Sequence, residues 1–219
     1  LTSLPILAFT GSMLSTAFVY RISRTGKKAP TTILLLSGIA VASFFSAVTT
    51  LLMILNRSEL HQIFFFLMGG FFNCRWRQVY IILPFALLGL IISAFFYREL
   101  DIMLMGEEKA YHLGLEEGRL QLEMIISASL LVGAAVSVAG IIGFVGLVVP
   151  HMARLVVGPL HRRLLPVSAL TGGVFLLAAD TIARSIVAPI ELPVGIITAF
   201  IGAPFFLYLL KKEKRIRAI

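Results

Sequence analysis

Residues 140–158 are Gly140-Ile-Ile-Gly-Phe-Val-Gly-Leu-Val-Val-Pro-His-Met-Ala-Arg-Leu-Val-Val-Gly158. The segment is apolar enough for a membrane interior, yet it contains four glycines, a proline, a histidine and an arginine. Relative to alanine, glycine costs a helix interior about 1 kcal/mol and proline about 3 kcal/mol, so a helix that only had to cross lipid would avoid both. In membranes these residues serve close helix packing, a kink, or backbone that lines a polar cavity. The segment therefore indicates a transmembrane helix with a function beyond spanning.

The composition of the whole chain is that of a membrane protein. Of its 219 residues, 58% are hydrophobic and 14% are charged, and the mean hydropathy is +0.97. Soluble domains carry about a quarter charged residues, and one globular core could not hide this excess of apolar side chains. Strands of a membrane barrel would alternate apolar and polar residues, which runs such as 83–96 and 196–210 do not. We therefore predict an all-α, polytopic transmembrane protein with a single membrane domain over residues 1–219.

Seven segments are candidate spans, since a span needs about 20 apolar residues. They are Pro5–Tyr20, Thr31–Leu55, Val79–Tyr97, Leu122–Ala139, the shorter Phe144–Val157, Pro166–Ala188 and Pro193–Leu210. The apolar run within residues 60–72 is too short to cross, so we predict a re-entrant or interfacial helix that ends at Gly69-Gly70. The polar loop Arg98–Gln121 contains the pattern of a short helix around Met105–Leu115.

Basic residues gather on one side of this topology. Of the 19 Lys and Arg, 14 lie in Arg21–Lys28, Arg98–Arg119, the turn His161-Arg162-Arg163 and the tail Lys211–Arg217. Positive charge favours the cytoplasmic side, so the C-terminus is predicted to be cytoplasmic. This placement accounts for the formal net charge of +8 without nucleic acid. Cys74 is the only cysteine, which excludes disulfides and cysteine-based metal sites within one chain.

Four ordered motifs and a weaker fifth resemble the signatures of the FecCD family, the bacterial permeases that import ferric siderophores, haem and cobalamin. The motifs are Gly143–Arg154, Met105–Gly114, Ala178–Arg184, Glu191–Phe205 and, more weakly, Met68–Phe71 followed by Trp76–Gln78. The likeness covers essentially the whole chain. Because the family has ten spans, the resemblance implies spans four to ten of a type II ABC importer permease fold. The opening Leu1-Thr-Ser-Leu-Pro, without an initiator methionine, favours an N-terminally truncated chain.

The resemblance also implies a function and partners. We expect a permease subunit of an ATP-driven importer of an iron-siderophore, haem or cobalamin, in a bacterial or archaeal cytoplasmic membrane. The expected partners are two cytoplasmic ABC ATPase subunits, an extracytoplasmic substrate-binding protein, a second permease copy or paralogue, and membrane lipid. The sequence has no Gly-x-x-x-x-Gly-Lys-Ser/Thr, so ATP and Mg²⁺ are expected in the ATPase partner. This chain is expected to bind no cofactor or metal and to be a transport subunit, not an enzyme.

By resemblance, residues near 101–118 form the coupling segment, which sits in a groove of the ATPase. Such a contact needs a short rigid element with apolar anchors and a polar rim. The expected anchors are Leu104, Met105, Ala110 and Leu113, the rim is Glu107, Glu108 and Lys109, and the bounding glycines are Gly106 and Gly114. The residues by themselves equally describe an ordinary solvated loop helix.

Two further sites are expected at the ends of spans. Asp180 and Arg184 are four residues apart, so they share a helix face. The resemblance implies that Arg184 receives a carboxylate of the binding protein, which a guanidinium can hold through two hydrogen bonds. A structural ion pair is the alternative. Thr31 and Thr32 open the second span, by resemblance at the cytoplasmic gate, although capping of the helix by threonine or its Ala29-Pro30 start explains them nearly as well.

His151 and Arg154 suggest a proton relay or a metal site. A lone intramembrane histidine without His, Cys or carboxylate partners is weak support for a metal. We expect His151 to hydrogen-bond to nearby polar groups instead, because Pro150 frees a carbonyl one turn back. Gly143 and Gly146 are predicted to allow close packing. These five residues are therefore predicted to transmit motion, not to bind substrate.

A membrane-embedded protease and an ion-gradient-driven secondary transporter are the two rival functions. A membrane-embedded protease would need a buried nucleophile with a base, or a His-Glu-x-x-His pair, and neither occurs. An ion-gradient-driven secondary transporter would need buried carboxylates near mid-membrane, for which Asp180 is thin support. The secondary transporter stays as the alternative.

Overall fold

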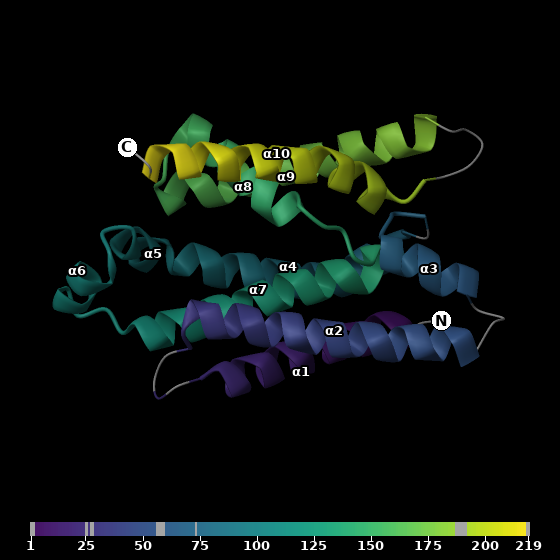
Figure 1. The fold of residues 1–219 in the computed structure, drawn as a ribbon, viewed down its shortest axis with the longest axis horizontal. Coiled ribbons are helices and arrows are strands. Elements are labelled where there is room, and N and C mark those ends of the chain that lie inside the picture. The colour runs from purple at the N-terminus through teal and green to yellow at the C-terminus, as the bar shows by residue number, and fades with distance from the viewer. Residues whose placement is uncertain are drawn as a thin grey trace. The chain divides into compact units, whose positions relative to one another are not determined.

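The computed structural model describes residues 3–24, 26, 29–55, 60–72, 74–186 and 192–217. Throughout these ranges the regular structure is helical (Figure 1). The helices are α1 Ser3–Ser23, α2 Thr31–Leu55, α3 Leu60–Met68, α4 Trp76–Phe95, α5 Tyr97–Met103, α6 Glu107–His112, α7 Glu117–Ala139, α8 Val145–Val157, α9 His161–Ile186 and α10 Val194–Arg217. The predicted all-α class is confirmed.

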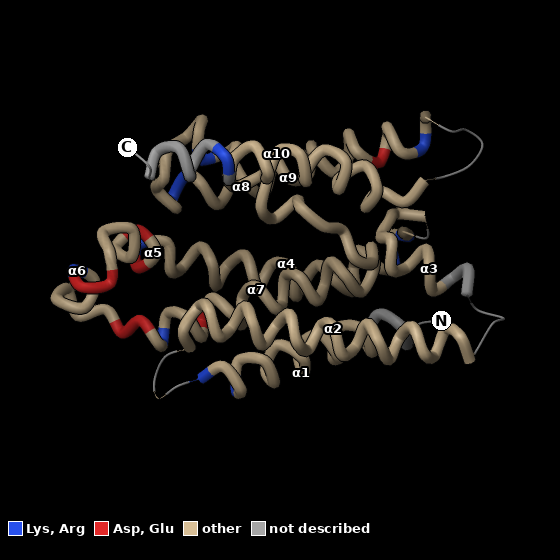
Figure 2. Tube along the Cα trace, in the orientation of Figure 1, with Lys and Arg blue, Asp and Glu red and all other residues tan. Residues whose placement is uncertain are grey.

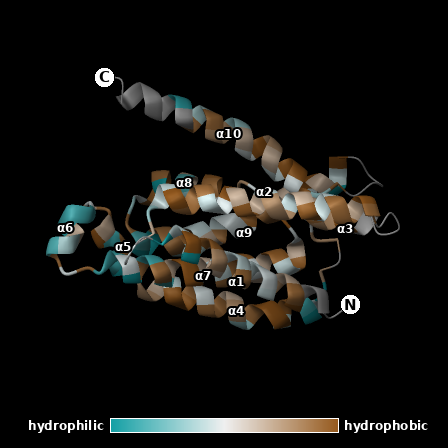
Figure 3. Ribbon diagram, turned by 60° about the horizontal axis from the view of Figure 1, so that its bottom comes forward, coloured by the Kyte–Doolittle hydropathy of each residue, from teal (hydrophilic) through white to brown (hydrophobic). Residues whose placement is uncertain are grey.

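Five helices, α1, α2, α4, α7 and α9, are long and apolar enough to cross a membrane. The helix α8 and the apolar part of α10, Val194–Leu209, are shorter. Apolar residues run along the helices, and polar residues gather at α6 (Figure 3). The chain is thus a multi-pass membrane protein. Each predicted span corresponds to one helix, and the short run near residues 60–72 is the nine-residue α3.

Two basic segments predicted as a turn and a tail are helical in the structure. The residues His161-Arg162-Arg163 are the first turn of α9, not a turn before it, because Pro166 removes only one backbone donor and the helix runs through it. The tail from Lys211 continues α10 to Arg217. The predicted end of the sixth span at Ala188, the motif residue Glu191 and the basic residues Lys27, Lys28 and Arg57 lie outside the described residues.

The chain divides into two compact units. Unit 1 comprises residues 1–64 and 75–138, and unit 2 comprises residues 65–74 and 139–219. The boundary falls within α3, whose last turn belongs to unit 2. Figure 2 shows that, in each unit taken alone, the described charges lie mostly toward helix ends and short connections. The expectation of a single membrane domain stays a prediction.

In unit 1, α4 and α7 approach closely at Gly89. A Cβ on Gly89 would lie 2.7 Å from Leu131 Cγ and 3.1 Å from the Ser127 carbonyl oxygen. The Ser127 hydroxyl donates to the Gly89 carbonyl at 2.7 Å, and Ser93 Oγ lies 2.6 Å from Ser127 Oγ. Small residues and hydroxyls hold helices together in membranes, where burial of apolar surface gives little drive for association. This contact therefore fixes the two helices that flank α5 and α6.

The helix α1 packs against the same pair. Phe9 meets Phe85 of α4 with ring centroids 4.6 Å apart. A Cβ on Gly133 of α7 would lie 3.2 Å from both Phe9 Cδ2 and Ser12 Oγ. The helix α2 contacts α1 and has no buried residue. It is the most exposed of the long helices in unit 1.

Unit 2 is built on α8, α9 and α10, which contact one another pairwise. Its core contains Ala179 and Ala183 of α9 and Val194 and Ile197 of α10. The helix α8 turns into α9 through Gly158, whose φ is +85° and whose N–H donates to the Arg154 carbonyl at 3.0 Å. Alanines on α9 let α10 lie close, so this unit is also held by small residues.

We predict that Gly89→Ala lowers the unfolding temperature of the detergent-solubilised protein. The added methyl must displace Leu131 or separate α4 from α7, and overpacking of this kind costs about 1–3 kcal/mol. The matched control is Gly38→Ala, in α2 of the same unit, where an added Cβ meets no atom within 4 Å. Equal effects of the two substitutions would contradict the close approach.

Candidate coupling, docking and transmission sites

The predicted coupling segment consists of two short helices joined by a turn. The helix α5 ends at Met103, and Met105 and Gly106 donate backbone hydrogen bonds to Ile102 and Met103. Gly106 has φ +98°, a conformation that side chains disfavour, and α6 begins directly after it. The short helix expected around Met105–Leu115 is α6, which has six residues because Gly106 and Gly114, with φ +78°, bound it.

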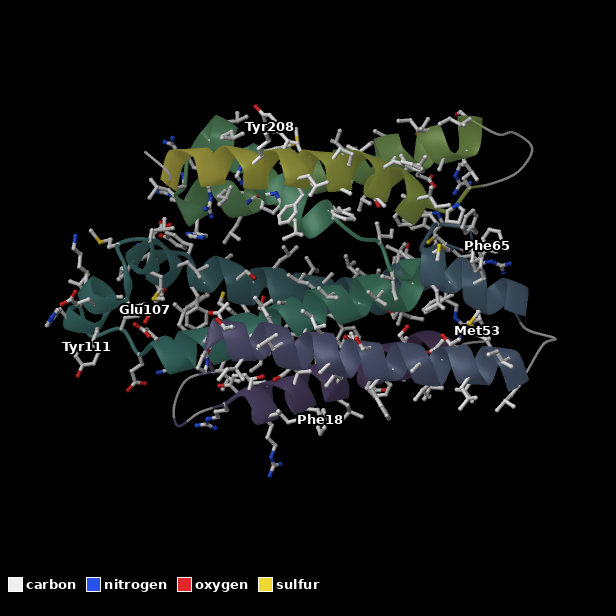
Figure 4. The ribbon with its side chains drawn as sticks, viewed as in Figure 1. Phe18, Met53, Phe65, Glu107, Tyr111 and Tyr208 are labelled. Carbon is white, nitrogen blue, oxygen red and sulfur yellow. The ribbon has the colours of Figure 1, made fainter. Side chains whose placement is uncertain are left out.

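Of the four expected anchors of this segment, three are exposed and one is buried. Leu104, Met105 and Leu113 are 45%, 59% and 62% exposed. Ala110 is fully buried, so it cannot be an exposed anchor. Glu107, Glu108 and Lys109 are exposed as expected of a polar rim. Figure 4 shows the Tyr111 side chain extending from α6 away from the neighbouring helices of the unit.

Backbone hydrogen bonds close the end of the segment directly before α7. Gly114 N–H donates to the Tyr111 carbonyl at 2.9 Å, and Leu115 N–H donates to the Ala110 carbonyl at 3.1 Å. The helix α7 begins two residues later, at Glu117. The segment is short and internally bonded from α5 to α7, as a rigid contact element requires.

The helix α2 begins at Thr31, as predicted, and both threonines are exposed. Its first turn is closed by Leu34 N–H, which donates to the Pro30 carbonyl at 2.9 Å. Just before it, Ala29 is 1% exposed, and both its backbone groups pair with the Gln121 side chain of α7. The choice between gate and helix start stays open for Thr31 and Thr32.

In unit 2, the opening of α8 is strained. Phe144 has φ +66°, the one positive φ among the described non-glycine residues. Such a left-handed conformation costs a side-chain-bearing residue about 1–2 kcal/mol. A Cβ on Gly202 of α10 would collide with the Phe144 side chain, so α10 lies tightly against this residue. The packing of α10 therefore helps to hold Phe144 where α8 begins.

Pro150 and His151 lie within α8, not at its end. Pro150 has no N–H to give to the carbonyl of Gly146, which eases a bend at that turn. The His151 ring contacts the Phe205 ring of α10, with centroids 6.3 Å apart. The predicted hydrogen bond of His151 stays a prediction. Arg154 is exposed in the last turn of α8, where a cation interacts favourably with the helix dipole.

Glycines bring three distant segments of unit 2 into backbone contact, and we call Gly69, Gly140 and Gly195 the glycine junction. A Cβ on Gly140 would collide with the Phe66 carbonyl, one on Gly69 with the Ile141 carbonyl, and one on Gly195 with the Met68 carbonyl. Hydrogen bonds accompany these contacts: Gly70 N–H donates to the Ala139 carbonyl at 2.8 Å, and Gly195 N–H to the Gly69 carbonyl at 3.3 Å. Within unit 2, the junction joins residues 66–70 and residues 139–141 to the start of α10.

A cavity of about 390 Å³ adjoins the glycine junction. Its lining is mostly apolar and comes from the end of α3, the stretch before α8 and the first turns of α10: Leu67, Met68, Ile141, Gly143, Phe144, Gly195, Ile196, Ala199 and Phe200. Among the described residues, an added Cβ on Gly143 or Gly146 meets no atom within 4 Å, and the close packing expected at these two positions stays a prediction. Close approaches occur at Gly140, Gly195 and Gly202.

Arg184 forms an ion pair at the end of α9. Its Nε donates to Asp180 Oδ2 at 2.9 Å, and the two side chains are 43% and 22% exposed. Cys74 lies near this pair: partial burial raises the pKa of its thiol, Asp180 raises that pKa further, and Arg184 lowers it. The thiol is therefore protonated and weakly nucleophilic at neutral pH. The structural ion pair exists, and a docking role for the exposed part of Arg184 stays a prediction.

No group of three His, Cys, Asp or Glu side chains that could hold a metal ion occurs in the part of the chain that the structure describes.

Residues 1–212 match the FecCD transport family. The chain belongs to this family. It is 48% identical over 212 residues to the cobalamin import system permease protein BtuC of Halobacterium salinarum, which covers 97% of this chain and 57% of that protein. It is 38% identical over 216 residues to the hemin transport system permease protein HmuU of Yersinia pestis, which covers 96% of this chain and 63% of that protein.

A solved structure shares the fold of this FecCD chain. It is described as an inward-facing conformation of a metal-chelate type ABC transporter. The TM-score is 0.79 at 30% sequence identity, over 95% of this chain and 71% of that one. The FecCD chain spans 57% and 63% of the lengths of the two curated relatives.

Sequence patterns did not single out several residues that organise this FecCD chain. Gln121 was placed at the end of a polar loop, yet its amide pairs with Ala29, 92 residues away. Phe144 was expected only as the start of a span. Gln121 lies in the polar first turns of α7, beside Arg119 and Glu123, so the sequence gives no signal that its amide has a distant partner. A strained phenylalanine leaves no signal in one sequence either.

We predict that Gly140→Ala destabilises the FecCD chain more than Gly158→Ala. Both glycines have positive φ, +69° and +85°, so both substitutions cost the left-handed penalty. Only the methyl at residue 140 collides with a carbonyl, which adds about 1–3 kcal/mol. Unfolding temperatures of the two variants in detergent measure the difference. Equal shifts would show that main-chain contact at the junction is unimportant.

Proposed function

We propose that this chain is the membrane-spanning part of a permease subunit of an ATP-binding-cassette importer. Its cargo is an iron-siderophore, haem or cobalamin, carried across the cytoplasmic membrane by alternating access. Membership of the FecCD family supports the proposal, as do relatives named for cobalamin and hemin import. Five helices of spanning length and composition support a multi-pass location.

The observation that carries the proposal is the exposed coupling segment. Leu104, Met105 and Leu113 expose large apolar side chains on a short, internally bonded element at one end of unit 1. Such side chains on a polar, loop-bounded segment favour a protein partner, because an apolar anchor beside a charged rim fits a groove. The sequence contains no phosphate-binding loop, so the proposed partner is an ATPase that binds ATP and Mg²⁺. The chain itself is then a transport subunit, not an enzyme.

The remaining partners follow from the two ends of the helices. A basic C-terminal tail supports a cytoplasmic C-terminus with two ATPase subunits on that side. Arg184 supports docking of an extracytoplasmic binding protein at the opposite end of α9 from the basic turn His161–Arg163. The exposed α2 supports a second permease copy or paralogue, since none of its residues is buried within this chain.

The mechanism has three steps in this proposal. A loaded binding protein docks in part on Arg184. Closure of the ATPases on ATP displaces the coupling segments. The spans then rock, with Thr31 and Thr32 at the cytoplasmic gate, while Pro150, His151 and Arg154 in α8 take part in transmission within unit 2.

We predict that liposomes containing the full-length permease, its ATPase and its binding protein accumulate substrate only with ATP. In the same complex, Leu113→Ala should weaken ATPase binding by about tenfold, because truncating an anchor residue of an interface typically costs more than 1 kcal/mol. Uptake of radiolabelled substrate and ATPase affinity for the permease in detergent are the measurements.

Glu116→Ala is the matched control for Leu113→Ala. Glu116 is also exposed and follows α6, but it lies outside the predicted anchors and rim. Uptake driven by an ion gradient without ATPase would overturn the importer proposal in favour of a secondary transporter. Equal ATPase affinity of the Leu113 and Glu116 variants would remove Leu113 from the contact.

We predict that Arg184→Glu lowers the affinity of the permease for its binding protein by about tenfold or more. The change replaces a cation with an anion opposite the expected carboxylate, and like charges that face each other across an interface cost several kcal/mol (about 2 or more). Surface plasmon resonance with the permease in nanodiscs measures the affinity.

The control is Arg162→Glu, the same charge change in the first turn of α9, at the far end of the helix. It should leave binding-protein affinity unchanged. Assembly with the ATPase should survive Arg184→Glu. An affinity unaltered by Arg184→Glu would remove Arg184 from the docking site.

A further inference from the structure

Gln121 makes a paired contact with the backbone of Ala29 in unit 1. The Ala29 N–H donates to Gln121 Oε1 at 3.0 Å, and Gln121 Nε2 donates to the Ala29 carbonyl at 2.6 Å. The two residues are 92 positions apart. One side chain thus satisfies both polar groups of a distant peptide residue, and the two bonds together fix position and orientation.

The contact decides how α2 starts. Ala29 is 1% exposed, so its backbone groups cannot turn to water, and an unpaired buried group is costly. It precedes Pro30, which restricts Ala29 to extended conformations. The Pro30 carbonyl then accepts the first helical bond, from Leu34 at 2.9 Å. The direction of α2 at Thr31 therefore depends on the position of Ala29.

Gln121 is connected to the coupling segment through backbone that is hydrogen-bonded from α6 to the first turn of α7. Leu115 is bonded to Ala110 of α6, and Leu120 N–H donates to the Glu116 carbonyl at 3.1 Å in the first turn of α7. Leu120 is 6% exposed. Gln121 is the next residue, so a displacement of α6 reaches its side chain through bonded backbone and one turn of helix.

We propose that Gln121 is the positioning residue that carries displacement of the coupling segment to the start of α2 at Ala29–Thr32. The inference rests on the proposed function. It adds the route by which an ATPase bound at α6 acts on the start of α2. Without Gln121, ATP hydrolysis continues, but the α2 terminus no longer follows the coupling segment.

The test uses the complete transporter in liposomes and compares substrate imported per ATP hydrolysed. In Gln121→Ala this ratio falls about fivefold or more, the low end of the range for coupling between two sites. ATPase activity stays close to that of the unsubstituted complex. A residue that served stability alone would lower import and hydrolysis together and leave the ratio unchanged.

Hydrogen–deuterium exchange gives a second readout that needs only ATPase binding. In the unsubstituted complex, addition of a non-hydrolysable ATP analogue changes exchange at peptides covering residues 29–36. In Gln121→Ala that response is lost, while the response of peptides covering the coupling segment persists. If Gln121→Ala does not fold, Gln121→Glu replaces it: a carboxylate still accepts from Ala29 N–H but cannot donate to its carbonyl.

Gln78→Ala is the matched control. Gln78 Oε1 also accepts a backbone N–H in unit 1, that of Arg75 at 2.8 Å, but this bond is local and lies at the start of α4. Its transport ratio and exchange response should equal those of the unsubstituted complex. An unchanged ratio in the Gln121 variant, or a nucleotide response at residues 29–36 that persists without Gln121, would overturn the inference. Absence of ATP-driven uptake by the unsubstituted complex would instead refute the proposed function, and exchange would still decide the role of Gln121.

Discussion

Direct contact between main chains at positions without a Cβ is the constraint on which each unit depends. Lipid supplies little hydrophobic drive for helices to associate, so close approach and hydrogen bonds must provide it. In unit 1 this occurs where Gly89 meets Ser127, and in unit 2 at the glycine junction. The coupling segment connects α4 to α7, and the contact between Gly89 and Ser127 fixes these two helices. The glycine junction fixes both the start of α10 and the end of α3.

Sequence predicted the helices well where an apolar run has clear ends. The bounds of α2, Thr31–Leu55, are as predicted, because Pro30 and the threonines mark its start. The start of α9 was placed too late because Pro166 looked like a helix beginning, whereas a helix can continue through one missing donor. The bounds of α6 inside the pattern around Met105–Leu115 could not be predicted, because glycines can lie inside a helix or end it, and only the positive φ of Gly106 decides.

The sequence predicted where the site residues lie along the chain, but not which distant residues they contact. Arg184 and Asp180 lie on one helix, so spacing alone predicted their ion pair. The partners of Gly140, Gly195 and Gln121 lie tens of residues away, and one sequence carries no information on such pairs. Ala110 shows the same limit within a short helix: the apolar pattern of α6 could not tell which alanine or leucine faces inward.

The glycine junction also bears on how such a chain can diversify. Its contacts join main-chain atoms of three segments, so their geometry does not depend on the size or chemistry of the surrounding side chains. Residues that line the neighbouring cavity can be substituted while residues 66–70, residues 139–141 and the start of α10 keep their positions. The three glycines, by contrast, constrain one another, since a side chain at any of them separates all three segments. A scaffold of this kind lets the cavity lining vary while the backbone frame of unit 2 is kept.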